Sequence, residues 1–172
     1  MLKREVRIIK KYLTGMYGGK FMPFHKGHKY CLDIAARECE TVYLILFHGG
    51  QQEVAILEEH DEEYLTVEAR IKRLKNLVKE YDNVKLAIID VSNLVKEDGT
   101  EDWDAETPLV REVVGDRLDA VYSSEKKYNP YFKRAYPEAV HRVVDSGRKK
   151  FPISGTKVRN IKNLKEREKW II

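Results

Sequence analysis

The sequence predicts an α/β protein built on an open, doubly wound parallel sheet of five strands with helices on both faces. Two observations carry this prediction. Apolar, β-branched runs alternate with segments of helical period, and the connections between them are only a few residues long. The run over residues 41–47 is also apolar or aromatic almost throughout, which is typical of a strand covered on both faces.

The predicted elements follow one another along the chain. Four apolar residues from Leu2 to Leu13 share one helical stripe, so residues 2–13 predict a short amphipathic helix. Residues 65–81 predict the clearest helix, because their apolar side chains recur every three or four positions. The predicted strands are 14–19, 41–47, 84–91, 120–122 and 139–144, and the further predicted helices are 27–38, 105–114, 128–136 and 154–161.

Nothing in the chain marks a boundary between domains. Its 172 residues suit one domain, and no linker, repeat or low-complexity stretch interrupts them. We therefore expect a single domain over 1–172, with an N-terminal helix (1–13), an α/β core (14–162) and a C-terminal extension (163–172).

Composition indicates a globular, cytoplasmic protein. Hydrophobic residues make up 42% of the chain, which argues against disorder. The longest apolar run, residues 42–47, is too short to cross a bilayer, and the charged N-terminus lacks the apolar stretch of a secretory signal. Cys31 and Cys39 match no zinc or redox spacing, so we expect them to be reduced packing residues.

Charge is distributed unevenly behind a net charge of +4. Residues 1–29 hold eight Lys/Arg and one Glu, residues 147–172 hold nine Lys/Arg and two Glu, and residues 38–69 hold nine acids without Lys or Arg. If the two basic ends fold together, they form a positive site for a polyanion such as a triphosphate or a nucleic acid. An uneven but solvated surface is the alternative, and composition alone favours it.

The turn after the strand at 14–19 is the most unusual stretch of the sequence and reads Gly-Gly-Lys-Phe-Met-Pro-Phe-His-Lys-Gly-His over residues 18–28. Gly18 and Gly19 let the backbone approach a ligand closely. His25 and His28 stand at the start of the next helix, whose free N–H groups and positive dipole end favour a phosphate. Ligands of doubly wound sheets bind beyond the carboxyl ends of the strands, where this turn lies. The turn therefore predicts a polyphosphate site.

Other interpretations of this turn fit less well. Two histidines could bind zinc, but a zinc site needs at least three protein ligands, and His48, His60 and His141 lie in unrelated segments. The dinucleotide fingerprint G-x-G-x-x-G and the P-loop G-x-x-x-x-G-K-[ST] are both absent from the sequence. A purely structural glycine-rich turn is the remaining alternative.

Two separated motifs resemble those of the nucleotidyltransferase superfamily. Residues 19–28 look like its G-x-F-x-P-x-H-x-G-H signature, whose H-x-G-H is shared with class I aminoacyl-tRNA synthetases, and residues 153–159 resemble its I-S-x-T-x-x-R. The second motif alone is a common helix cap, but both in this order at opposite ends of one α/β domain are specific. The resemblance implies a Rossmann-like nucleotidyltransferase fold, in which Ser154 and Thr156 cap a second helix and Arg159 reaches the same phosphates.

Further segments resemble the adenylyltransferase domain of NadR-type nicotinamide-nucleotide enzymes. The loop before Trp103 is shorter than in those enzymes, and we expect neither their kinase domain nor an N-terminal DNA-binding domain here. The matching features are Lys20 within G-K-F, T-V-x-x-R at 66–70, the acidic loop 97–99 followed by Trp103, S-S-E at 123–125, and the D-x-x-R of Asp145 and Arg148.

The resemblance implies transfer of AMP from ATP to nicotinamide mononucleotide (NMN), which yields NAD and pyrophosphate by direct in-line attack. On this basis we expect Lys20, His25, His28 and Arg159 to be catalytic. Mg²⁺ should ride on the ATP phosphates, and no dedicated metal site is expected. The expected ATP-binding residues are Gly18, Gly19, Lys20, Phe21, His25, His28, Ser123, Ser124, Glu125, Ser154, Thr156, Lys157 and Arg159.

The expected acceptor-binding residues are Arg70, Trp103 and Tyr128. An indole on an acidic loop can stack on a cationic pyridinium ring, whereas the usual fate of a tryptophan is the core. Arg70 could equally be a surface residue of its helix, and for Tyr128 simple packing is the favoured interpretation.

Three other functions stay open. The same chemistry could act on another acceptor, such as phosphopantetheine, FMN or, as cytidylyl transfer, a polyol phosphate. A non-catalytic nucleotide sensor is disfavoured by the intact histidines and Arg159. A nucleic-acid-binding module is disfavoured because the aromatic residues are not interleaved with the basic ones. The expected partners are therefore ATP and NMN, without nucleic acid or membrane, and a homo-oligomer stays open.

Overall fold

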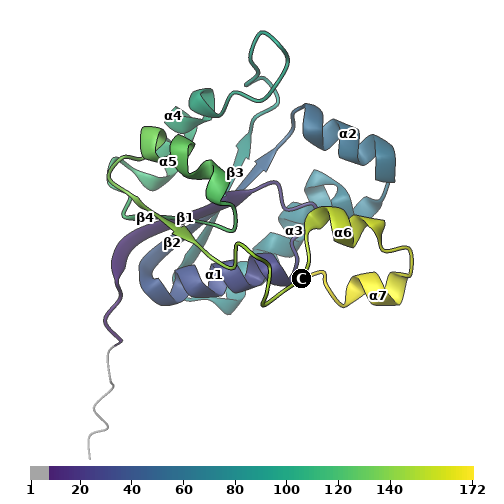
Figure 1. Cartoon of the computed structure of the whole chain (residues 1–172), viewed down its shortest axis with the longest axis horizontal. Coiled ribbons are helices and arrows are strands. Elements are labelled where there is room, and N and C mark those ends of the chain that lie inside the picture. The colour runs from purple at the N-terminus through teal and green to yellow at the C-terminus, as the bar shows by residue number, and fades with distance from the viewer. Residues whose placement is uncertain (1–7) are drawn as a thin grey trace, which may run out of the picture.

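The computed structural model describes residues 8–172 and contains one parallel five-stranded sheet between two layers of helices (Figure 1). The sheet order is β3-β2-β1-β4-β5, so the direction of winding reverses between β1 and β4. The doubly wound α/β fold that the sequence predicts is thereby confirmed. The strands are β1 (Tyr12–Gly19), β2 (Cys39–His48), β3 (Val84–Asp90), β4 (Ala120–Ser123) and β5 (Val140–Val143).

Helices cover both faces of the sheet. In Figure 1, α1 and α3 lie on one side of the strands, and α4 and α5 lie on the other. Within residues 8–172, every helix is too short or too polar to cross a bilayer. The helices are α1 (Lys26–Glu38), α2 (Gln51–His60), α3 (Val67–Leu77), α4 (Trp103–Val114), α5 (Asn129–Ala135), α6 (Gly155–Asn160) and α7 (Leu164–Glu168), with 3₁₀ turns at η1 (Glu63–Leu65), η2 (Val78–Glu80) and η3 (Lys126–Tyr128).

Strands β1 and β4 contribute alternating side chains to two separate cores, one on each face of the sheet. On β1, Tyr17 joins the core under α1 and α3, whereas Met16 joins the core under α4 and α5. Tyr122 and Val121 divide in the same way on β4. Because successive side chains of a strand point to opposite faces, this arrangement fixes the register of the sheet.

The predicted N-terminal helix is wrong in the part that the structure describes. Residues 8–11 are not helical, and Tyr12 and Leu13 belong to β1. Tyr12 pairs with Cys39 of β2, and the Leu13 and Thr14 backbone amides donate to the Asp119 carboxylate. These bonds satisfy the backbone in an extended form. The two described residues of the predicted stripe pack against no core, since Ile9 is 93% and Leu13 59% exposed. Residues 2–7 of that prediction lie outside the described residues.

Two helices have no counterpart in the sequence-based prediction. Helix α2 lacks an apolar stripe, and its one buried side chain is Glu53, so periodicity gives no signal there. Helix α7 lies in the predicted C-terminal extension and buries only Arg167, whose guanidinium pairs with Glu62. Ion pairs rather than apolar periodicity hold both helices in place.

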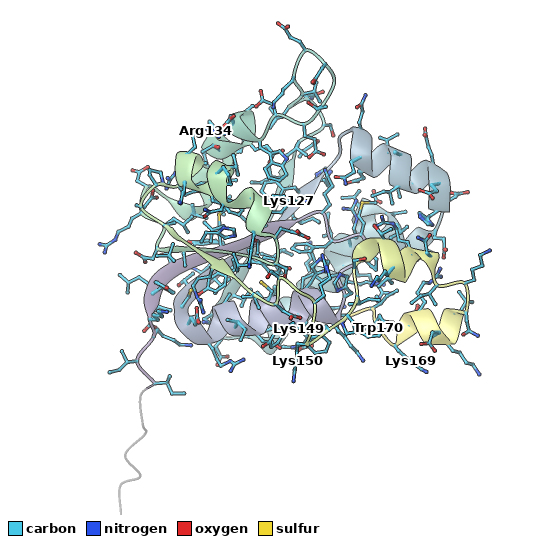
Figure 2. All side chains as sticks on the ribbon, in the orientation of Figure 1. Lys127, Arg134, Lys149, Lys150, Lys169 and Trp170 are labelled. Carbon is cyan, nitrogen blue, oxygen red and sulfur yellow. The ribbon has the colours of Figure 1, made fainter. Side chains whose placement is uncertain are left out.

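The last residues of the chain pack back against the turn that follows β1. The amide of Lys26 donates to the Trp170 carbonyl at 3.0 Å, and Ile171 forms an antiparallel bridge with His25. Trp170, labelled in Figure 2, has the Lys26 ammonium 5.9 Å from its ring centre. Ile171 also packs in a small core with Ile153 and Val158. Residues 170–172 therefore pack against the start of α1 and the turn before it.

Replacing Ile171 with alanine should destabilise the protein by about 2–3 kcal/mol, because a buried aliphatic side chain is lost from this small core. Urea unfolding measures the change. Leu164→Ala on α7 is the matched control, since Leu164 is 64% exposed and its loss should change stability by less than about 0.5 kcal/mol. Equal effects of the two substitutions would show that the C-terminal segment does not depend on this packing.

Candidate functional site

A cavity of ≈480 Å³ opens at the carboxyl ends of β1 and β4, where the sheet order reverses. Its size lies in the range of small-molecule sites, and its place is where doubly wound sheets bind ligands. Two kinds of wall meet in it. One is polar and includes His25, His28 and Arg159, and the other is aromatic and includes Trp103 and Tyr128.

The two histidines hold each other in a fixed orientation at the start of α1. The Gly27 amide donates to Nδ1 of His25 at 3.1 Å, and the His25 amide donates to Nδ1 of His28 at 3.2 Å. The rings stack with their centroids 3.7 Å apart. Because both Nδ1 atoms accept hydrogen bonds, each neutral ring carries its proton on Nε2. Nε2 of His25 is buried and has no partner among the described residues.

Burial keeps both histidines neutral. Burial, followed by the positive charge of Arg148, lowers the pKa of His25 from 6.5 to about 4. Burial also holds the pKa of His28 well below 6.5, with smaller contributions from His25 and Arg148. At neutral pH the pair therefore presents N–H donors rather than positive charges, and the nearby arginines supply the charge.

Glycine is required between the histidines for steric reasons. A Cβ on Gly27 would lie 2.9 Å from Cε1 of the His25 ring, closer than carbon atoms pack. The ring cannot retreat, because it is stacked on His28. The H-x-G-H spacing thus follows from the way in which the two rings share the helix start.

The second motif lies directly against the first. Arg159 of α6 donates from Nη1 to the Met22 carbonyl at 2.7 Å and from Nη2 to the Thr156 hydroxyl at 3.2 Å. A Cβ on Gly155 would lie 3.2 Å from the Met22 oxygen, so the start of α6 sits close to the turn. The Ser154 hydroxyl caps α6 by accepting from the Lys157 amide at 3.2 Å. Residues from opposite ends of the chain therefore border one cavity.

Lys20 lines the same cavity but is engaged with neighbouring loops. Its ammonium donates to the Gly49 carbonyl at 2.8 Å and pairs with Glu101 at 2.8 Å. Both partners lie in loops that follow strands β2 and β3. A bound polyphosphate would compete with Glu101 for this ammonium.

The structure brings nearly all of the predicted site residues to the cavity wall. Lys157 is the exception in the predicted ATP site, because its side chain is exposed and does not line the cavity. The predicted residues in the wall are Gly18, Gly19, Lys20, Phe21, His25, His28, Trp103, Ser123, Ser124, Glu125, Tyr128, Ser154, Thr156 and Arg159.

Arg70 lies behind the cavity rather than in its wall. Its side chain is buried, donates to the Lys20 carbonyl at 2.8 Å and pairs with Glu53 at 2.5 Å. The other oxygen of Glu53 accepts from the Gly49 amide at 2.9 Å. Arg70 and Glu53 therefore connect the loops after β1 and β2, and they position Lys20 from behind.

Five charged residues in the wall are absent from the predicted site residues, namely Glu101, Glu106, Lys127, Asp145 and Arg148, and two of them are notable. Arg148 donates to the Ile153 carbonyl at 2.7 Å and pairs with Glu125 at 3.0 Å, so it joins the S-S-E segment to the second motif. Its D-x-x-R spacing is visible in the sequence. Glu106 lies one helical turn after Trp103, and this i, i+3 spacing is the sequence signal for a shared face. Burial and then the neighbouring Glu101 raise the pKa of Glu106 from 4.5 to about 7.

The aromatic wall is built from α4, the turn before α5 and α5 itself. The Trp103 ring lies 5.0 Å from Tyr128 and 5.2 Å from Tyr131 between centroids, both edge to face. The Trp103 carbonyl also accepts from the Tyr131 hydroxyl at 2.9 Å. Within residues 8–172, no three His, Cys, Asp or Glu side chains gather closely enough to hold a metal ion.

A doubly wound sheet with histidine and arginine donors converging at its switch point defines a nucleotide-binding α/β protein. The profile of the family described as cytidylyltransferase-like matches residues 16–161. The chain therefore belongs to this family of the nucleotidyltransferase superfamily, and the superfamily predicted from the two motifs is confirmed.

Curated relatives include two kinds of enzyme. A phosphopantetheine adenylyltransferase of Mycoplasma mycoides subsp. mycoides SC is 27% identical over 161 residues, covering 89% of this chain and 99% of that protein. The trifunctional NAD biosynthesis/regulator protein NadR of Escherichia coli K12 is 24% identical over 155 residues, covering 87% of this chain. The match spans only 37% of the NadR protein.

Solved structures share the fold. A NadR protein in complex with NAD and AMP-PNP superposes with a TM-score of 0.67 at 21% identity, covering 95% of this chain and 46% of that chain. The nicotinic acid mononucleotide adenylyltransferase of Plasmodium falciparum, complexed with NaAD, superposes with a TM-score of 0.54 at 14% identity, covering 94% and 90%.

NMR titration of the histidine rings should show both Nε2–H tautomers and no midpoint near 6.5 for either ring. The His25 midpoint should fall near pH 4, because protonation would charge a buried ring. The folded protein then holds fewer protons than the unfolded chain between about pH 4 and 6.5, so acidification through this window should destabilise it. A His25→Ala variant assigns the signals, and a midpoint near 6.5 for either ring would contradict the geometry.

Proposed function

We propose that this chain is an adenylyltransferase that transfers AMP from ATP to NMN, forming NAD and releasing pyrophosphate. One observation carries the proposal: the turn bearing His25 and His28 and the arginine of the second motif border one cavity, joined through the Met22 carbonyl. Such a junction suits a polyphosphate held from two sides. The relatives support the class of reaction, since their names include adenylyltransferases of phosphopantetheine and of nicotinic acid mononucleotide.

The proposed reaction is a direct displacement. The phosphate oxygen of NMN attacks the α-phosphorus of ATP, a P–O bond to the acceptor forms, and the bond to the leaving pyrophosphate breaks. The attacking phosphate is already ionised at neutral pH, so no general base is required. Catalysis then consists of holding two anions in line and stabilising the charge that develops on pyrophosphate.

The polar wall of the cavity suits this task. Neutral His25 and His28 aim N–H donors without the repulsion that a buried cation pair would bring. Arg159 and Lys20 supply positive charge from opposite ends of the sequence, and Lys20 would exchange Glu101 for a phosphate oxygen. Ser123 to Glu125 at the end of β4 would border the adenosine.

Mg²⁺ would be held by the phosphate oxygens and water. Among residues 8–172, no three His, Cys, Asp or Glu side chains gather closely enough to bind the ion without the nucleotide. When bound, the ion would neutralise charge on the leaving pyrophosphate.

The aromatic wall favours a flat acceptor. The Trp103 ring, with Tyr128 at 5.0 Å and Tyr131 at 5.2 Å between centroids, provides an aromatic surface that suits the pyridinium ring of NMN. Phosphopantetheine is the second candidate acceptor. The near full-length match to the Mycoplasma mycoides enzyme favours it. Pyrophosphate release measured with ATP and each acceptor in turn separates the two.

His28→Ala should lower kcat for NAD formation by about 100-fold, because a donor to the developing charge is lost. Pyrophosphate release from ATP and NMN measures the rate. His60→Ala is the control, since His60 lies at the end of α2 outside the cavity and its loss should leave kcat unchanged. A folded His28→Ala enzyme with the wild-type rate would refute the assignment.

A further inference from the structure

Glu106 is a buried carboxyl in the cavity wall that the proposed reaction does not use. Its side chain is 6% exposed, and it lies on α4 facing the cavity. Burial and neighbouring charges shift its pKa, and no side-chain or backbone hydrogen bond contributes to that shift. Its oxygens are not among the fully buried unpaired atoms of the described residues, so they open onto the cavity and can accept from a ligand.

The surroundings of Glu106 identify the part of the ligand that it faces. Trp103 precedes it by three residues, so both side chains lie on the same face of α4 and line the same cavity. Tyr131 of α5 stands against Trp103 and also lines the cavity. The carboxyl is therefore set beside the aromatic wall, where the proposed acceptor places its flat ring.

The charged side chains around Glu106 are mostly negative, so its carboxyl can attract a positive or N–H-donating group of a ligand. Lys20 is the only nearby cation that influences it among the described residues, and that ammonium is already paired with Glu101. Glu101 and Asp102 add negative charge from the loop before α4. Above its pKa of about 7, where Glu106 is ionised, this end of the cavity therefore favours N–H donors and disfavours a second carboxylate.

We infer that Glu106 selects the carboxamide form of the pyridine nucleotide over the acid form, by accepting a hydrogen bond from the carboxamide N–H₂. This inference rests on the proposed function. NMN offers a positive ring and an amide donor to the Glu106 carboxyl. Nicotinic acid mononucleotide would instead bring a carboxylate against it. Trp103 and Tyr128 contact the ring of either nucleotide, so they bind both without distinguishing them.

The test compares kcat/KM for NMN and for nicotinic acid mononucleotide, each with ATP, in the wild type and in Glu106→Gln. Glutamine keeps the shape of the side chain, still accepts from a carboxamide and can donate to a carboxylate. The wild type should prefer NMN by about 10-fold or more, and Glu106→Gln should reduce that ratio by about 10-fold, chiefly through a lower KM for the acid form. Glu112→Gln, on the exposed side of the same helix, should leave the ratio unchanged.

Each outcome decides the inference. An unchanged ratio in Glu106→Gln, or an equal loss for both nucleotides, overturns it, because a purely structural carboxyl would affect both alike. If Glu106→Gln does not fold, Glu106→Leu serves instead and should also lower the ratio, since the repulsion is removed. Failure of the proposed function looks different: the wild type would then release pyrophosphate with phosphopantetheine and with neither pyridine nucleotide.

Discussion

The hydrogen bond from Arg159 to the Met22 carbonyl joins the two ends of the chain, and the candidate site depends on it. Met22 belongs to the turn after β1, and Arg159 belongs to the short helix α6. The close approach of Gly155 to the same carbonyl and the shared core of Ile153, Val158 and Ile171 hold the two segments together beside it. Donors from residues far apart in sequence therefore line one cavity, and an anion bound there would be neutralised from two directions.

Contacts elsewhere in the structure fix the position of the turn after β1, against which Arg159 packs. The Trp170 carbonyl accepts from the Lys26 amide, and Ile171 forms a β-bridge with His25, so both residues hold the start of α1. From behind, the buried pair of Arg70 and Glu53 fixes the Lys20 carbonyl and the Gly49 amide. A buried ion pair adds little net stability, but breaking one partner leaves an unpaired charge, so such pairs fix local geometry. The cavity wall is thus preorganised before any ligand arrives, as electrostatic stabilisation of a transition state requires.

The sheet and most of the cavity wall could be predicted from the sequence, because both depend on short local sequence patterns. The strands are short apolar runs, and the histidine turn has a spacing that Gly27 makes sterically necessary. The wrong or missing predictions share a different origin. Helix α2 and the inward position of Arg70 depend on one ion pair, and the extended form of Tyr12 depends on partners in β2 and on Asp119. Glu106 belongs to no motif, and its i, i+3 spacing from Trp103 does not by itself show that this face of α4 lines a cavity. Contacts between distant segments decide these features, and a single sequence does not show them.

A crystal structure with NMN and a non-hydrolysable ATP analogue would show whether the two motifs bind one polyphosphate. We expect a single polyphosphate that accepts hydrogen bonds both from Nε2 of His28 and from the Arg159 guanidinium, with the pyridinium ring against Trp103. A triphosphate bound outside this cavity, or one that contacts the histidines while Arg159 stays turned away from it, would show that the two motifs do not form a shared site.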